Sequence, residues 1–325
     1  MYINCFDPAQ AVGGWFRMGN RANEGYAEMT VCLYLPPEHD GDRERRSVAF
    51  MYRRPNITDN DAFDAGGMRW TIVTPFEELR VEYTGTVVVL DEPEQMANPR
   101  EAFGSNPHVE CEVRLTFTGQ GRASMFGGEP DQPHEAPGEE FAKGHYEQLV
   151  AATGTIRVGD REWLIDGHGL RDHSWGPRFW QSPWYYRWLT ANVDRDLGFM
   201  ASRVAKRDGP GTRGGFVWED GRMHYCDHVE LSTATRGDDA FHERIDGVLR
   251  SSRSDREWRF TGKVVDLIPL RNRRQDPEGN WLMTRISEGM TKWTVGSDAY
   301  EGREGWGMSE YLDQIIDGRP VGIAE

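Results

Sequence analysis

Residues 108–118 read HVECEVRLTFT, and their alternation is the clearest structural signal in the chain. Every second residue from Val109 to Phe117 is apolar, while the residues between them are charged or hydroxylated. Successive side chains of a β-strand point to opposite faces, so this pattern predicts a strand with one buried and one solvated face.

Runs rich in β-branched and aromatic residues recur on both sides of this stretch, separated by Gly, Pro, Asn and Asp. They are residues 27–36, 47–54, 68–75, 79–90, 154–165, 257–269, 281–286, 291–295 and 305–315. Gly159-Asp160 and Asp220-Gly221 stand between such runs as two-residue hairpin turns do. The sequence therefore predicts an all-β chain of antiparallel strands.

Residues 119–139 lose this pattern and are dominated by Gly, Pro and acidic residues, as expected for a long loop or linker. We place a domain boundary there, with an N-terminal β domain over 1–140 and a C-terminal β domain over 141–325. Two antiparallel barrels or sandwiches packed side by side would satisfy the strand spacing in both halves. Helix signals are few, and short turns are expected only at 96–103 and at the start of 139–152.

Composition excludes several classes of partner. The 325 residues carry a formal charge of −15, which argues against nucleic acid and anionic membrane surfaces. No stretch approaches the roughly 20 apolar residues of a membrane span, and the first residues do not resemble a signal peptide. The four cysteines are widely spaced, and we expect Cys32 and Cys111 to be free, buried thiols in a cytoplasmic protein.

The block GHGLRDHSWGPRFW at 167–180 holds the most promising functional residues. A buried aspartic acid can protonate an alkene, and we expect Asp172 to be that acid, with His173 orienting it or positioning water. In an extended block, His168 and Asp172 share one face, whereas Arg171 and His173 share the other. The alternative interpretation is a structural Asp–His hydrogen bond.

Aromatic side chains crowd the same region and continue beyond it. They could wall a pocket and stabilise a carbocation through their π-faces, by about 1–2 kcal/mol each. The residues expected to line the pocket beside His168 are Trp175, Trp180, Trp184 and Tyr185. The alternative for each ring is packing in a core or between domains.

The segment GHYEQ at 144–148 is a second candidate. His145 and Glu147 are two residues apart, so on a strand they face the same way and can act as a base and its orienting group. The alternative is a solvated strand face at the domain junction.

No metal or other cofactor is expected. In HYCDH at 224–228, His224 and His228 would lie about 13 Å apart on a strand, too far to share one ion. HGLRDH at 168–173 has no recognised ligand spacing. The chain contains neither a phosphate-binding glycine loop nor a G-x-S-x-G nucleophile motif.

Four segments together resemble a bacterial family of two-domain, lipocalin-like proteins: 6–36, 144–163, the block GLRDHSWGPRFW and the final GREGWGMSEYLDQI. The resemblance covers nearly the whole chain. A thinner similarity, carried by the DHSWG-type block and the two-barrel layout, links it to carotenoid 1,2-hydratase (hydroxyneurosporene synthase) and related lipocalin-like cyclases. The resemblance implies a pocket for a hydrophobic molecule and chemistry without a redox cofactor. Asp172, His173 and Trp175 match the block that such enzymes carry.

These observations favour a cofactor-free acid/base enzyme acting on a terpenoid-, steroid- or polyketide-like substrate. The reaction would be hydration, isomerisation or cyclisation at an alkene or enone, with Asp172, His173, His145 and Glu147 as catalytic residues. The main alternative is a carrier that binds a lipid or terpenoid without chemistry. A weaker one is a metal-dependent oxygenase or hydrolase using His168, Asp172 and His173.

Overall fold

Strands dominate the computed structural model, as the sequence predicts. It describes residues 1–38, 46–57, 63–119, 125–126, 144–176, 182–209, 211–276, 278–297 and 300–323. Of the expected linker at 119–139, only Gly119 and residues 125–126 belong to this described part. The chain divides into two compact units: Met1–Met125 with Glu147–His173, and Phe126–Tyr146 with Ser174–Glu325.

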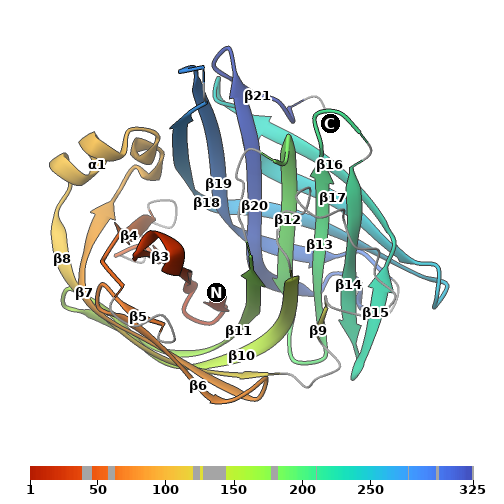
Figure 1. The fold of residues 1–325 in the computed structure, drawn as a ribbon. Helices are drawn as coiled ribbons and strands as arrows, with labels where there is room; N and C mark the ends of the chain where they lie inside the picture. Colours follow the sequence, from red (N-terminus) through yellow and green to blue (C-terminus); the bar gives the residue numbers. More distant parts are fainter. Residues whose placement is uncertain are drawn as a thin grey trace. The chain divides into compact units, whose positions relative to one another are not determined.

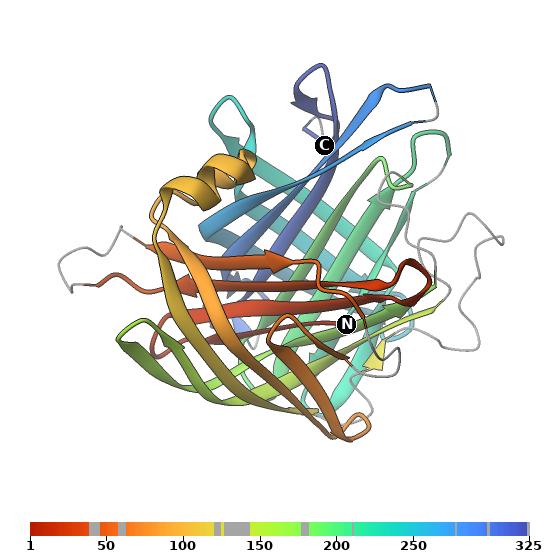
Figure 2. The ribbon, with the colours of Figure 1, turned by 60° about the vertical axis from the view of Figure 1, so that its left-hand side comes forward.

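The first sheet holds the strands that precede residue 176. They are β1 (Tyr2–Asp7), β2 (Val12–Arg21), β3 (Tyr26–Leu35), β4 (Ser47–Arg53), β5 (Phe63–Ala65), β6 (Met68–Thr74), β7 (Glu78–Leu90), β8 (His108–Gly119), β9 (Met125–Phe126), β10 (Gly144–Val158) and β11 (Arg161–Trp175). Their order is β4-β3-β2-β1-β11-β10-β8-β7-β6-β5, and β4 also pairs with β7. This extra pairing closes β4, β3, β2, β1, β11, β10, β8 and β7 into an antiparallel barrel, visible in Figure 2.

The barrel interior is filled by the alternating apolar residues that the sequence reveals. Cys111, Val113, Leu115 and Phe117 of β8 are buried, whereas Arg114 between them is exposed. Large side chains elsewhere, such as Tyr83, are also fully buried. Burying a side chain of this size stabilises the fold by about 2–3 kcal/mol. The predicted one-sided burial of 108–118 is confirmed.

The second sheet holds the remaining strands, which run from green to blue in Figure 1. They are β12 (Tyr185–Asn192), β13 (Leu197–Ala205), β14 (Thr212–Glu219), β15 (Arg222–Cys226), β16 (His228–Arg236), β17 (Phe241–Ser251), β18 (Arg256–Gln275), β19 (Trp281–Val295), β20 (Glu304–Ile316) and β21 (Arg319–Pro320). Their order is β15-β14-β13-β12-β20-β19-β18-β17-β16, with β21 on β20.

This second sheet rolls up around its own core. Its terminal strands β15 and β16 follow each other in the chain, separated only by Asp227. Across the interior, Phe199 of β13 stacks on Phe260 of β18 with ring centroids 4.4 Å apart, and Trp293 of β19 meets both rings edge-on. The fold class predicted from the sequence is therefore confirmed for both units: each is an antiparallel, lipocalin-like β structure.

Helices are short, as expected. They are η1 (Ala22–Glu24), η2 (Pro93–Ala97) and α1 (Pro99–Ser105), the last two covering the predicted turn at 96–103. Phe103 of α1 packs edge-on against Phe50 of β4. The helical turn expected from residue 139 is not found where the chain is described, because 144–152 lie in β10, whose residues 150–158 pair with β8. Residues 139–143 lie outside the described residues.

Two further sequence predictions can be compared with this fold. The hairpin turns Gly159-Asp160 and Asp220-Gly221 are confirmed, and Gly159, Asp220 and Gly221 all have positive φ. All four cysteines are buried thiols. β10 and β11 pair with β8 and β1, and most of their residues, 147–158 and 161–173, fall in the first unit, whereas the domain boundary at 140 stays a prediction. No helix within the described residues is long and apolar enough to cross a membrane.

One predicted pair of strands is a single strand. Residues 281–286 and 291–295 belong together in β19, which runs unbroken through Gly289. A Cβ at Gly289 would come within 2.7 Å of Ser309 Oγ and 2.9 Å of His242 Nε2. Glycine is therefore needed because two side chains of the sheet occupy that space, and it does not mark a turn here.

Candidate functional site

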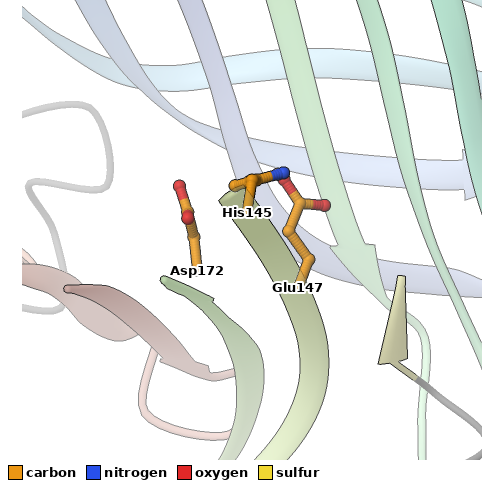
Figure 3. A group of neighbouring side chains, drawn as sticks. All are labelled: His145, Glu147 and Asp172. Atoms are coloured by element: carbon orange, nitrogen blue, oxygen red, sulfur yellow. The ribbon is translucent and has the colours of Figure 1, made fainter. Parts of the chain in front are cut away.

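Three residues singled out in separate sequence segments meet in the structure. His145 and Glu147 lie on β10 and Asp172 on β11, and one nitrogen or carboxylate oxygen from each lies within 4.8 Å of the others. Glu147 is only 1% exposed, while His145 and Asp172 are half-buried. Figure 3 shows a His145 nitrogen beside a Glu147 oxygen, with the Asp172 carboxyl group on the neighbouring strand. We call these three residues the polar cluster.

A hairpin positions the polar cluster. β10 and β11 are neighbours joined by the tight turn at Gly159-Asp160. Glu147 and Asp172 lie the same number of residues from this turn, so an unbroken two-residue hairpin places them opposite each other. His145 lies two residues before Glu147 on the same strand and thus on the same face.

Arg171 and Asp172 are neighbours in sequence but point to opposite faces of β11, as the alternation predicts. Arg171 is buried, with its guanidinium carbon 5.9 Å from the centre of the Phe76 ring. Together with Ile3 and Phe117 it lines a cavity of about 10 Å³ on the inner side of the barrel. A cavity of that size holds about one water molecule. The polar cluster therefore lies on the outer side of the barrel wall, away from Arg171.

The two histidines of the block at 167–180, His168 and His173, are not part of the polar cluster. His173 shares the face of Arg171, and its ring meets Phe63 edge-on at 6.4 Å. His168 shares the face of Asp172 but lies farther along β11. Burial lowers the pKa of His168 below its usual range, an effect that the carboxylate of Asp166 partly offsets. His168 is therefore mainly neutral at pH 7.

The predicted aromatic residues are dispersed over two sheets. Trp175 ends β11 with 51% of its surface exposed, and its ring lies 6.4 Å from that of Tyr146. Trp184 and Tyr185 belong to the start of the second sheet, where Arg207 lies 5.0 Å from the Trp184 ring and Arg187 4.8 Å from the Tyr185 ring. Trp180 lies outside the described residues. By strand alternation, Trp175 shares the face of Arg171 and His173 and therefore lies across the sheet from Asp172.

The donor set of the polar cluster also suits a divalent metal ion. One imidazole nitrogen and two carboxylate groups are ligands that zinc, iron and manganese accept. Among the described residues, no other group of three His, Cys, Asp or Glu side chains gathers its ligand atoms in this way. His224 is hydrogen-bonded to Ser254 and His228 to Glu230.

A second polar group, which no sequence motif indicated, lies in the interior of the second sheet. His242, Arg285 and Ser287 line a common cavity with the ion pair of Arg187 and Asp313. The strand that supplies Arg285 and Ser287 mixes polar and apolar residues on both faces, so its alternation gives no signal. That His242 and Arg285 lie near each other can be recognised only once the pairing of the strands is known.

The fold and the polar cluster define a class: an antiparallel, lipocalin-like β protein that carries a His–Glu–Asp group on one hairpin. The chain belongs to the family of the domain of unknown function DUF7064, whose model matches residues 1–315. No curated protein matches the sequence.

Solved structures share the fold over nearly the whole chain. A Nitrosomonas europaea protein provisionally named AttH has a TM-score of 0.54 at 10% identity, over 98% of this chain and 91% of that chain. CghA with Sch210972 has a TM-score of 0.50 at 12% identity, over 96% of this chain and 86% of that chain. At such identities the likeness establishes the fold alone.

Proposed function

We propose that this protein is an enzyme that performs acid/base chemistry on a hydrophobic small molecule without a redox cofactor. The substrate class is a terpenoid-, steroid- or polyketide-like alkene or enone, and the reaction is hydration, isomerisation or cyclisation. The observation that carries the proposal is the convergence of His145, Glu147 and Asp172. Two carboxylates this close repel each other, so a proton shared within the group or a protonated imidazole stabilises it.

Burial suggests a role for each member of the polar cluster. Asp172 is half-buried and accessible to a substrate, so it serves as the acid that transfers its proton to an alkene carbon. His145 is also half-buried and takes the proton that an attacking water, or a neighbouring C–H bond, must lose. Glu147 is fully buried and acts as a positioning residue that holds the imidazole. The proton that His145 accepts then passes to Asp172, directly or through water, which restores both residues and balances the proton count over one turnover.

Two further observations support a hydrophobic substrate. The sequence resemblance to carotenoid 1,2-hydratase and lipocalin-like cyclases points to the same chemistry. CghA, which shares the fold, has been crystallised with Sch210972, which supports small-molecule binding by this architecture.

Solvent isotope incorporation tests the proposal. The protein is incubated in D2O with a panel of terpenoid, steroid and polyketide alkenes and enones, and deuterium in the recovered molecules is measured by mass spectrometry. Wild type should incorporate deuterium into at least one compound, and Asp172→Asn should abolish this. Asp166→Asn is the matched control, because Asp166 is an exposed carboxylate on the same face of β11.

The outcomes separate the enzyme from the carrier. A compound that binds and is released unchanged, by wild type and Asp172→Asn alike, would identify a lipid or terpenoid carrier. Native mass spectrometry of the freshly purified protein, followed by extraction of any bound molecule, provides the first member of the panel. Deuterium incorporation that survives Asp172→Asn would remove Asp172 from the acid role.

A metal centre is the second candidate function, and the donor set of the polar cluster favours it. One nitrogen and two carboxylates within 4.8 Å of one another can coordinate a divalent ion that activates water. Elemental analysis of protein purified without chelator decides between the two. One equivalent of zinc, iron or manganese, lost in Asp172→Asn but kept in Asp166→Asn, would replace the acid/base proposal with a metal-dependent one.

A further inference from the structure

A second, independent site lies in the second sheet. Its cavity has a volume of about 20 Å³ and lies between strands β12, β16, β17, β19 and β20, which can be followed in Figure 1. Register places Arg187, Tyr311 and Ser287 side by side across β12, β20 and β19, with Asp313 and Arg285 paired one step further along. These positions continue the inner face that holds Trp293 and Leu189, so the cavity is the polar end of this unit's core.

Several polar groups of the cavity are already engaged. Arg187 donates to both carboxylate oxygens of Asp313 and to the carbonyl oxygen of Gly322. The Tyr311 and Thr233 hydroxyl groups are 2.6 Å apart. His242 stacks on Tyr311 with ring centroids 4.0 Å apart, and its Nε2–H donates to the Ser309 carbonyl oxygen at 3.1 Å. These groups form a rigid frame.

Two donors in this frame find no acceptor within the described part of the chain. Ser287 is 1% exposed, and its buried hydroxyl group makes no hydrogen bond there. The Nε–H of Arg285 is also buried and makes none, although Nη1 of the same side chain donates to the Asp239 carbonyl oxygen. A buried donor without an acceptor is destabilising, so such groups require an explanation. Arg285 and Ser287 both line the same cavity, so an acceptor that enters it with a ligand would account for both donors.

The charge balance defines that acceptor. The carboxylate of Asp313 accepts hydrogen bonds from Arg187 and from the N–H of Gly322. That carboxylate and the carboxylate of the exposed Asp239 act on Arg285 through their charge and form no hydrogen bond with it. Burial lowers the pKa of the Arg285 guanidinium, but arginine remains protonated in proteins. His242 is fully buried and its pKa falls to about 3, through burial and the nearby Arg187, so it adds no charge at pH 7. Arg285 is therefore a cavity-lining cation whose Nη1 donates to a carbonyl oxygen and not to a carboxylate, and it offers one of the two available donors.

We propose that this cavity binds the carboxylate group of an aliphatic acid, with Arg285 Nε–H and Ser287 Oγ–H as its donors. The cavity of about 20 Å³ holds about one or two water molecules, which the two carboxylate oxygens would replace. Ala240, Pro320 and Ile323 line the same cavity, and Ile323 is 44% exposed, so an apolar surface leads from the cavity towards solvent. An alkyl tail would follow it. Arg–carboxylate bonds are among the strongest polar contacts in proteins, which suits a site this small.

Calorimetric titration tests this site. We expect octanoate to bind one per chain, acetate to bind more weakly for lack of a tail, and octanol to bind at least tenfold more weakly for lack of charge. Ser287→Ala should weaken octanoate binding about tenfold without lowering the melting temperature, because it removes an unsatisfied hydroxyl group. Arg285→Gln should weaken it more than tenfold, and Arg285→Lys should recover part of the loss.

Arg271→Gln is the matched control. Arg271 is exposed and lies opposite Arg285 in the register of β18 and β19. Its substitution therefore removes the same charge as Arg285→Gln, but outside the cavity. Its octanoate affinity should stay within about twofold of wild type. Absence of octanoate binding, equal loss in Arg271→Gln, unchanged affinity in Ser287→Ala, or equally tight binding of inorganic phosphate would each overturn the proposal. Should Arg285→Gln fail to fold, Ser287→Ala and Arg285→Lys decide it.

Discussion

Arg187 and Asp313 form a buried ion pair between β12 and β20, with two parallel hydrogen bonds of 3.0 and 3.1 Å. Their side chains are 8% and 4% exposed. The pair also holds the backbone of Gly322, which donates to Asp313 and accepts from Arg187. It therefore fixes the segment after β20 to the inner face of the second sheet.

Breaking this pair should be costly. Asp313→Asn leaves the Arg187 charge buried without its counter-ion, and we expect the free energy of unfolding to fall by about 3–5 kcal/mol. Urea denaturation measures the change. Asp246→Asn is the control, because its pair with Arg244 is exposed on both sides and should be worth at most about 1 kcal/mol. Similar losses in both variants would show that the buried pair contributes little.

His242 makes stability depend on pH. Its pKa of about 3 in the folded protein lies below the usual value near 6.5, so the unfolded chain binds a proton that the folded chain refuses. The free energy of unfolding is therefore unaffected by protonation of His242 above about pH 6.5. It decreases as the pH falls from 6.5 towards 3, by roughly 3–5 kcal/mol in all. His242→Gln should flatten the curve of unfolding free energy between pH 7 and 4 relative to wild type. Parallel curves for the two proteins would refute this.

Much of the fold is encoded locally. The alternation of 108–118 and the turns at Gly159-Asp160 and Asp220-Gly221 determine strands and hairpins without distant partners. The closure of the barrel through β4 and β7 is not visible locally, because it depends on pairing Val48 with Leu90 across two intervening strands. Such long-range pairs leave no periodicity in the sequence.

The polar cluster was partly predictable. His145, Glu147 and Asp172 are each recognisable, and counting outward from the turn at Gly159-Asp160 places Glu147 opposite Asp172. His173 was expected to orient Asp172 or to position water, but it lies on the other face of the strand, beside Phe63. The positions of the aromatic residues were harder to predict, because Trp184 and Tyr185 belong to a different sheet from Trp175. A run of aromatic residues in sequence says little about which rings share a surface.

Substitutions at Gly144 and Trp175 should have non-additive effects on the free energy of unfolding. A Cβ at residue 144 would lie 2.1 Å from Cζ2 of the Trp175 ring, so Gly144→Ala must push the ring aside. We expect a loss of about 1–2 kcal/mol in unfolding free energy, absent in the Trp175→Ala background. Gly104→Ala is the control, because a Cβ there meets nothing within 4 Å and sits in α1, where alanine favours the helix. Additive effects of the two substitutions would contradict the contact.

His145 and Asp172 should act as one unit in turnover. If His145 receives the proton that completes the cycle begun by Asp172, either variant alone removes the same pathway. His145→Gln and Asp172→Asn should then each reduce kcat by about 100-fold or more, and the double variant should be no slower than the slower single one. Losses that multiply in the double variant would show independent roles. Glu147→Gln separates positioning from proton transfer: as a positioning residue, it should lower kcat less than His145→Gln and shift the pH–rate profile.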